Sequence, residues 1–246
     1  HDAITLHKCN TNYVLCLDAG DSSSYSSGQT ITDRSNNSNN FYLGATSGVE
    51  ASDPTFTGTA GNLDGTATYF LFGTNELLSE TASHTYAANW HKSGATYSFL
   101  FLVFVATVTV DGGFATTKAS AGTDAGLEIG IVSATGKLKV VRSSTNSASV
   151  TSICNSGATV ADNSWVCFVV THTDGEAPKF YINGAAPISA DTVLTSTSTE
   201  ATSSPYYFGV SNVSLSYLPT GSKLVCCAAW DRIISASEAA SLYSSM

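Results

Sequence analysis

Short runs of apolar residues, separated by polar turn clusters, fill nearly the whole chain. Runs of about four to eight residues alternate with clusters of Gly, Asn, Asp and Ser, which is the pattern of β-strands joined by tight turns. Residues 97–110 and 165–171 are apolar at nearly every position, as in strands covered on both faces. The pattern predicts one all-β domain, a two-sheet antiparallel jelly-roll sandwich.

Two segments of the sequence predict β-hairpins. Residues 127–133 and 137–142 flank Ala134-Thr-Gly136, and residues 179–182 run into Asn183-Gly184. The Asn-Gly dipeptide tolerates positive φ and so suits the tight turn of an antiparallel hairpin.

The last part of the chain has a helical pattern instead. Apolar residues recur at helical intervals over residues 233–243, and Ser235 and Glu238 have the spacing of a capping box. We expect a short C-terminal helix that begins near Ser235. Arg232 is close enough in sequence to pair with Glu238 across the start of this helix.

The amino-acid composition argues against two classes of partner, nucleic acid and the membrane interior. The 246 residues include 36 Ser and 31 Thr but only 12% charged residues, and 43% are hydrophobic, which is enough to form a folded core. The net charge of −9 leaves no basic face for nucleic acid. The longest apolar run is shorter than the ~20 residues of a membrane-spanning helix. We therefore expect neither nucleic-acid binding nor membrane insertion.

The six cysteines do not have the spacing of a zinc site or a redox motif. Cys167, Cys226 and Cys227 lie in apolar strand-like segments, where a thiol usually acts as a small buried apolar group. In an oxidising compartment, Cys9 with Cys16, or Cys154 with Cys167, would form local disulfides. The same compartment would make the sequons that begin at Asn36 and Asn212 candidates for glycosylation.

Two stretches resemble a known family. The run Trp165-Val-Cys-Phe-Val-Val-Thr-His-Thr-Asp174, followed by Lys179-Phe-Tyr-Ile-Asn-Gly184, is similar to a hairpin of laminin-G-like domains in the concanavalin A-like lectin/glucanase superfamily. The ending, Ala229-Trp-Asp-Arg-Ile-Ile-Ser-Ala-Ser-Glu-Ala-Ala-Ser-Leu-Tyr243, resembles the family's final strand and short helix. The resemblance implies a concanavalin A-like sandwich spanning residues 15–246, preceded by an N-terminal extension or arm, residues 1–14.

The first third of the chain resembles a narrower branch of this family. Leu17-Asp-Ala-Gly20, Ser24-Tyr25, Thr32-Asp33-Arg-Ser35, Asp64-Gly65 and Trp90-His-Lys92 are similar to segments of laminin-G-like domains in structural proteins of tailed phages and other large viruses. This resemblance implies a place on a virion surface. The alternative is a secreted, extracellular protein.

Catalysis is not expected. Glucan-cleaving members of the superfamily carry two glutamates and an aspartate in an E-x-D-x-x-E triplet on one strand, which places nucleophile and acid/base on one face. None of the seven glutamates here has an aspartate two residues later. The sequence also lacks the G-x-S-x-G turn of serine hydrolases.

Binding sites have only weak candidates in the sequence. Asp111, Asp124 and Asp174 fall in expected rim loops, where related lectin-like domains often hold calcium, but they form no dense acidic cluster. The aromatic platform of a glycan site would come from Tyr25, Trp90, Tyr206 or Tyr207. The same aromatic residues would serve equally well in the core.

Two functions remain open. The first is a non-enzymatic virion structural or decoration protein, whose hydroxyl-rich faces contact capsid proteins and copies of itself through repeated weak contacts. The second is a lectin that binds cell-surface glycans as an attachment module.

Overall fold

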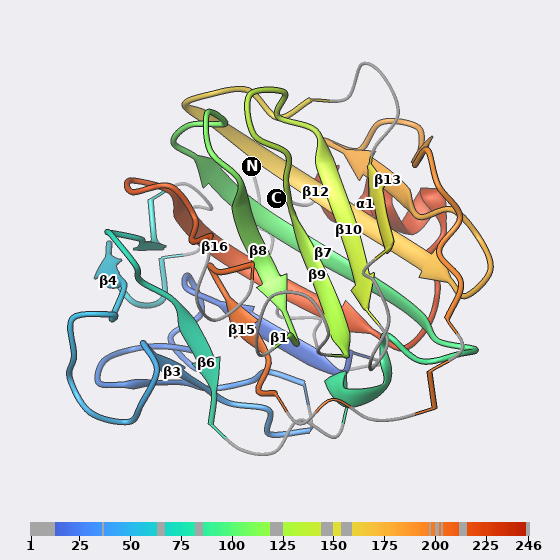
Figure 1. Cartoon of the computed structure of the whole chain (residues 1–246). Coiled ribbons are helices and arrows are strands. Elements are labelled where there is room, and N and C mark those ends of the chain that lie inside the picture. The colour runs from blue at the N-terminus through green and yellow to red at the C-terminus, as the bar shows by residue number, and fades with distance from the viewer. Residues whose placement is uncertain are drawn as a thin grey trace.

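The computed structural model of the chain describes residues 13–35, 37–62, 67–81, 86–118, 125–143, 150–153, 159–196, 198–199, 202, 204–211 and 216–244. Within these residues, the strands form two eight-stranded antiparallel sheets that pack face to face (Figure 1). The arrangement confirms the all-β sandwich with one short C-terminal helix. The N-terminal extension and the start of the domain remain predictions, because residues 1–12 lie outside the described part.

Sheet A contains the long strands. Its spatial order is β14 (Ile188–Ser189), β13 (Lys179–Ile182), β12 (Ser164–Thr173), β7 (Thr96–Val105), β16 (Lys223–Trp230), β5 (Tyr69–Leu71) and β4 (Thr55–Thr57), and β1 (Leu15–Asp18) also pairs with β16.

Sheet B is built mostly from shorter strands. Its order is β11 (Val150–Ile153), β10 (Leu138–Ser143), β9 (Gly126–Ile131), β8 (Gly112–Thr116), β15 (Tyr207–Phe208), β6 (Leu78–Glu80), β3 (Phe41–Leu43) and β2 (Thr30–Ile31). A short 3-10 helix, η2 (Ala87–Asn89), leads toward β7.

The main core lies between the two sheets. Alternate residues of β7, including Phe99 and Phe101, face this core and are buried. Phe101 and Phe114, from opposite sheets, each lie 4.8 Å from Phe168, measured between ring centroids. The aromatic residues that made these runs look like covered strands therefore hold the two layers together.

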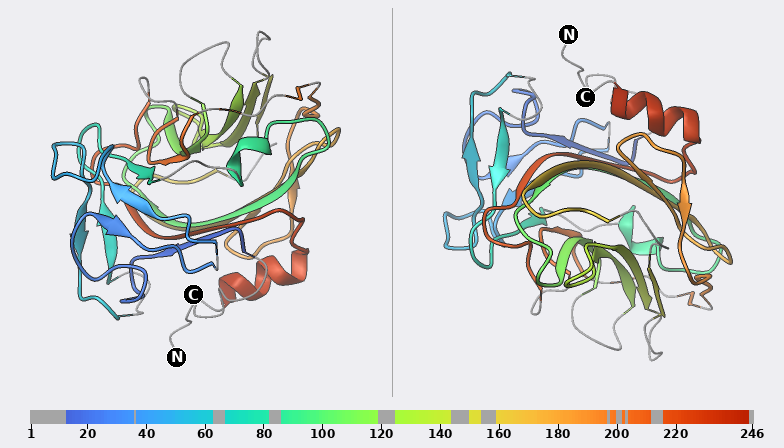
Figure 2. Two further views of the ribbon diagram at one scale, coloured as in Figure 1. Left: turned by 90° about the horizontal axis from the view of Figure 1, so that it is seen from below. Right: turned by 90° about the horizontal axis from the view of Figure 1, so that it is seen from above.

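A second, smaller core lies on the outer face of sheet A. There α1 (Ala236–Ser244) packs on the side away from sheet B (Figure 2). The capping box is confirmed: the Glu238 amide donates to Ser235 Oγ at 3.2 Å, and the Ser235 amide donates to Glu238 Oε2 at 2.7 Å. Arg232 forms an ion pair with Glu238 at 2.7 Å, which confirms the expected contact at the helix start.

Both predicted hairpins are present. β9 and β10 pair across residues 132–137, and β13 pairs with β14 beyond Asn183-Gly184. Asn183 and Gly184 have φ values of 49° and 71°. A Cβ on Gly184 would also lie 2.7 Å from the Tyr243 ring, so this turn lets α1 approach the sheet closely.

The predicted strand over residues 97–110 is too long. Strand β7 ends at Val105, because the next residues bond to loops instead of a strand. The Val108 amide donates to Asp162, and the Ala134 amide donates to the Val108 carbonyl. The chain therefore leaves sheet A early and carries Val110 and Asp111 to the rim of the sandwich.

Candidate functional site

One end of the sandwich carries an open groove of about 600 Å³, which we call the rim groove. Its walls are the loops that follow β5, β7 and β9 and the segment that precedes β16. The lining residues are Thr74, Asn75, Thr109, Val110, Asp111, Ser133, Ser216, Tyr217, Leu218, Pro219 and Thr220. Most of these side chains are polar and uncharged.

Hydrogen bonds between loops fix the groove's shape. The Ser133 amide donates to Asp111 Oδ1 at 2.8 Å, and Ser133 Oγ donates to the Thr109 carbonyl at 3.0 Å. Across the groove, the hydroxyls of Thr74 and Thr220 lie 3.1 Å apart. Each of the four walls is therefore tied to one neighbour, so the groove is shaped before any ligand binds.

Glycines on β8 let one wall approach the sheet. A Cβ on Gly113 would lie 2.0 Å from the Ser211 backbone nitrogen, and one on Gly112 would lie 3.3 Å from Pro219. No side chain fits at Gly113 without a shift of backbone. Two glycines in sequence therefore bring the segment with Tyr217 against the end of sheet B.

The groove keeps several polar groups open to solvent. Asp111 is exposed, and its second oxygen, Oδ2, accepts no hydrogen bond within the described part of the chain. Asn75 is exposed and has a φ of 62°, a conformation that asparagine tolerates well. Tyr217 is half-buried, and Val110 is 49% exposed. The groove therefore presents a carboxylate, an amide, hydroxyl groups and an aromatic ring to a ligand.

The predicted calcium residues do not come together. Asp111 lies in the rim groove, Asp174 lies at the other end of β7 and β12, and Asp124 is outside the described residues. Within those residues, no group of three or more His, Cys, Asp or Glu side chains is arranged to hold a metal ion. Calcium binding stays a prediction from the sequence.

Asp174 belongs to a buried polar cluster around Arg142. The Arg142 guanidinium is 2% exposed and forms an ion pair with Asp174 at 2.7 Å. It also contacts His172 Nε2 at 3.2 Å and donates to three backbone carbonyls, those of His91, Lys92 and Leu194. We call these groups the Arg142 cluster.

The charges of the Arg142 cluster are mutually satisfied. Burial alone would raise the pKa of Asp174, but hydrogen bonds from Gly94, Ser196 and Arg142 outweigh it, and the pKa is lowered. Burial, followed by the Arg142 charge, lowers the pKa of His172 to about 4, so the imidazole is neutral at pH 7. This carboxylate already has its cation and is a poor calcium ligand.

Three of the four aromatic glycan candidates are in the core. Tyr25, Trp90 and Tyr206 are all buried, and the Trp90 indole donates to Asp231 at 3.0 Å. Because each is almost fully buried, none of the three offers a ring face to a sugar in this structure. Tyr207 is different, because it is half-buried on the outer face of sheet B, opposite Ser79 and Thr116.

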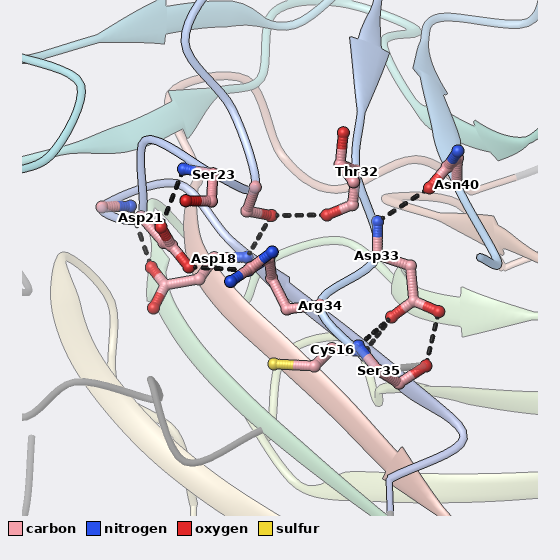
Figure 3. A network of polar contacts seen from close by, with 11 residues as sticks. Cys16, Asp18, Asp21, Ser23, Thr32, Asp33, Arg34, Ser35 and Asn40 are labelled. Carbon is pink, nitrogen blue, oxygen red and sulfur yellow. Dashed lines mark hydrogen bonds and ion pairs between the residues drawn. The ribbon is translucent and has the colours of Figure 1, made fainter. Parts of the chain in front are cut away.

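Polar residues of the N-terminal region around Asp33 form a structural network (Figure 3). The buried Asp33 carboxylate accepts hydrogen bonds from the amides of Cys16, Ser35 and Asn39 and from the Ser35 hydroxyl. Arg34 forms an ion pair with Asp21 at 2.9 Å. These residues attach the loop between β2 and β3 to β1.

The structure confirms the predicted buried thiols but not the disulfide proposed for Cys154 and Cys167. Cys167, Cys226 and Cys227 are free and buried, as expected for small apolar groups, and burial raises the pKa of Cys167 to about 12. The pairing of Cys154 with Cys167 is therefore wrong. Cys16 is bonded in a disulfide whose partner lies outside the described residues.

The two glutamates in sheet B lie on different strands. Glu128, on β9, forms an ion pair with Lys139 at 3.2 Å. Glu80, on β6, is buried, and its burial raises its pKa to about 8. Neither has the same-strand carboxylate partner that the glucan-cleaving triplet requires.

Sequence reasoning found Asp111 but missed Asn75, Val110 and Tyr217. These three come from separate loops and meet only in the folded chain. The one local signal was Asp111-Gly-Gly113, which marks a turn directly after the predicted strand over residues 97–110. Separately, no helix in the described part of the chain is long and apolar enough to cross a membrane.

Comparison with known proteins agrees with the fold. A family model for the concanavalin A-like lectin/glucanases superfamily matches residues 64–240. No curated protein sequence matches the chain.

Solved structures share the fold at low sequence identity. The binding domain of Paraclostridial Mosquitocidal Protein 1 is similar with a TM-score of 0.66 and 14% identity, covering 98% of this chain and 53% of that one. A structure of botulinum neurotoxin type C, whose cell entry depends on interaction with two ganglioside molecules, has a TM-score of 0.63 and 13% identity, over 98% and 53%. The Trypanosoma rangeli sialidase has a TM-score of 0.57 and 12% identity, over 94% and 32%.

The chain spans about half the length of the two toxin structures and a third of the sialidase. At these identities the likeness establishes the fold.

Proposed function

Because the chain belongs to the concanavalin A-like lectin/glucanase superfamily, we propose that it is a non-catalytic carbohydrate-binding module whose rim groove holds a neutral glycan. The observation that carries this proposal is the open polar lining of a groove already shaped by bonds between its loops. Such pockets, with a few placed polar groups beside an apolar surface, are the usual form of small-molecule sites.

The lining offers what a sugar needs. The free oxygen of Asp111 accepts hydrogen bonds from sugar hydroxyls, and the Asn75 amide both donates and accepts. The Tyr217 ring supplies an apolar surface for the C–H face of a pyranose, and its hydroxyl remains available as a donor.

The charge of the groove favours a neutral sugar. None of the described residues that line it is Lys or Arg, and Asp111 carries a negative charge. The chain as a whole has a net charge of −9. An anionic sugar would enter this groove against electrostatic repulsion and without a cation to pair with.

Two further findings support an extracellular binding role. Toxin binding domains share the fold, and the cell entry of one such toxin depends on gangliosides, which are glycan-bearing molecules. The disulfide at Cys16 is typical of proteins that work in oxidising, extracellular surroundings.

A catalytic role is disfavoured despite the similarity to a sialidase. Glu128 is paired with Lys139, and Glu80 is buried on a different strand, so the two do not form the carboxylate pair of a glucan-cleaving site. We therefore expect the chain to bind glycans without cleaving them.

The test is a glycan array followed by calorimetric titration of the best neutral ligand. We expect Asp111→Asn and Tyr217→Ala each to weaken binding about tenfold or more, because each removes a charged hydrogen bond or a stacking surface. Glu176→Gln changes an exposed carboxylate at the far end of the sandwich and should have no effect. Saturable binding that all three variants leave unchanged would place the glycan elsewhere and reject this site.

A structural role on a virion is the second candidate. It is favoured by the weakly charged surface, with 67 Ser and Thr residues, because short side chains lose little entropy when they are ordered in contacts between copies. In that case, the partners would be capsid proteins and further copies of the chain. Mass spectrometry of purified particles should then detect the chain at a fixed ratio to the capsid protein.

A further inference from the structure

The outer face of sheet A is only partly covered by α1. Helix α1 buries the half of this face around Cys226, Ala228 and Trp230. Beyond it, five neighbouring strands place one residue each directly side by side. From β4 to β12 these residues are Thr55, Leu71, Lys223, Phe104 and Trp165.

We call this row, together with Tyr69, the outer strip. Leu71, Lys223, Phe104, Trp165 and Tyr69 are all partly exposed, and Thr55 is exposed. The Trp165 ring lies 5.5 Å from Phe104 and 6.2 Å from Tyr69, edge to face in both pairs. The strip is thus a mutually packed aromatic surface that still reaches solvent.

A single cation is held over this surface. Lys223 Nζ lies 4.6 Å from the centre of the Tyr69 ring, 4.7 Å from Phe104 and 5.8 Å from Trp165. Three rings therefore hold the ammonium group in position through cation–π contacts. A long flexible side chain loses most of its freedom in such a place before any ligand arrives.

The charge of Lys223 has no carboxylate beside it. Elsewhere on the strands, Lys139 on β10 is paired with Glu128, and Arg142 on the same strand is paired with Asp174. Lys223 has no ion-pair partner among the described residues, although the chain has 19 acidic and 10 basic side chains. A fixed cation with a free charge complements an anionic ligand.

We propose that the outer strip is a second binding site, which takes an acidic sugar. Its carboxylate pairs with the Lys223 ammonium, and its apolar ring face lies against the exposed part of Trp165. The hydroxyl of Thr55, at the other end of the strip, lies on the same face and would hydrogen-bond a second sugar of a longer acidic glycan. This site differs from the rim groove in charge, in its strands and in the class of sugar it binds.

The test is calorimetric titration with sialyllactose and with a glucuronic acid disaccharide, each compared with neutral lactose. Two acidic probes separate a sialylated source from a uronate-containing one, and binding of either supports the site. The titrations use the Tyr217→Ala variant as background, so that binding in the rim groove does not contribute. Failure of the neutral-glycan proposal therefore leaves this test intact.

Three substitutions decide the role of Lys223. Lys223→Met keeps an unbranched apolar chain over the rings but removes the charge, so the acidic probe should bind at least about tenfold more weakly. Lys223→Arg restores the cation and should retain most of the affinity. Lys179→Met, which removes an exposed charge on β13, is the matched control and should change nothing.

The proposal has clear contrary results. It is overturned if neither acidic probe binds saturably, or if lactose binds as tightly as the acidic probe that binds better. It is also overturned if Lys223→Met and Lys223→Arg lose the same affinity, since that pattern reports packing instead of charge. Thermal unfolding of each variant, checked by circular dichroism, shows that the comparison is made between folded proteins.

Discussion

The two ends of the sandwich treat their carboxylates in opposite ways. At one end, Asp174 is held by the buried Arg142 guanidinium and by the amides of Gly94 and Ser196. At the other end, Asp111 accepts one hydrogen bond, from Ser133, and keeps an oxygen open to solvent. Strand β7 runs from one end to the other, and strands of both sheets contribute residues to each arrangement.

This difference separates a structural site from a candidate binding site. Polar groups that satisfy one another when buried hold the loops of one end together but offer nothing to a ligand. Polar groups that remain exposed to solvent can exchange a hydrogen bond to water for one to a ligand at little cost in free energy. From the sequence, both residues were equivalent calcium candidates in rim loops, and only their neighbours distinguish them.

We call the end with the Arg142 cluster the closed end and the end with the rim groove the open end. The largest expected change in stability is at the closed end. Arg142→Met leaves the Asp174 carboxylate without its cation and removes one donor from each of three carbonyls. We expect a loss of about 3–5 kcal/mol in the free energy of unfolding, as for other broken buried ion pairs. Chemical denaturation measures it.

Arg232→Met is the matched control. Its ion pair with Glu238 has a similar length, 2.7 Å, but both side chains are more than 40% exposed. The control should lose less than about 1 kcal/mol. If the two variants cost the same, the Arg142 cluster is not the structural element described here.

The next largest change in stability tests the packing of the rim-groove wall against β8. Gly113→Ala forces a Cβ against the Ser211 backbone, so the strand or the groove wall must move. We expect a loss of about 1–3 kcal/mol in the free energy of unfolding, the usual cost of overpacking. Glycan affinity should fall as well, because Tyr217 is carried by the wall that moves. A stable variant with unchanged affinity would show that this wall is not rigid.

Local signals in the sequence were enough for much of the fold. Ser235 with Glu238 located the start of the helix, and Asn183-Gly184 located a turn, because capping boxes and positive-φ turns depend on residues close together in sequence. The end of β7 was missed, because it is determined by bonds from residues 106–110 to Asp162 and Ala134, which lie far away in the chain.

The sites were much harder to predict. Trp90 and Tyr206 have the composition of a sugar platform but pack against each other in the core, with ring centroids 5.5 Å apart. Burial of this kind depends on which strands become neighbours. The outer strip has the same dependence, since Lys223 meets Phe104 and Trp165 only through the register of β16, β7 and β12.

A smaller effect at the closed end depends on pH. The pKa of His172 is lowered from 6.5 to about 4 by burial and by Arg142, with Asp174 acting in the opposite direction. As the pH falls from 6.5 toward 4, the unfolded chain takes up a proton that the folded chain does not. The folded state should therefore lose at most about 1.4 kcal/mol per pH unit in this range.

His172→Gln should remove this slope. Glu80 contributes the opposite trend. Its pKa is raised to about 8 in the folded chain, so the folded chain holds a proton that the unfolded chain releases, and the folded state loses stability as the pH rises from 4.5 toward 8. The informative quantity is therefore the difference between wild type and variant, measured by denaturation at several pH values. A difference that stays constant between pH 4 and 7 would contradict a neutral buried histidine.

The smallest expected effect is at Asp111. Asp111→Asn keeps an oxygen that accepts the hydrogen bond from Ser133, and the side chain is exposed, so the free energy of unfolding should change by less than about 0.5 kcal/mol. The same variant should weaken neutral-glycan binding about tenfold, because only the bound state uses the open oxygen. Denaturation and titration of one preparation measure both quantities. A loss of stability as large as that of Arg142→Met would mean that Asp111 holds the rim loops together, and the contrast between the two ends would fail.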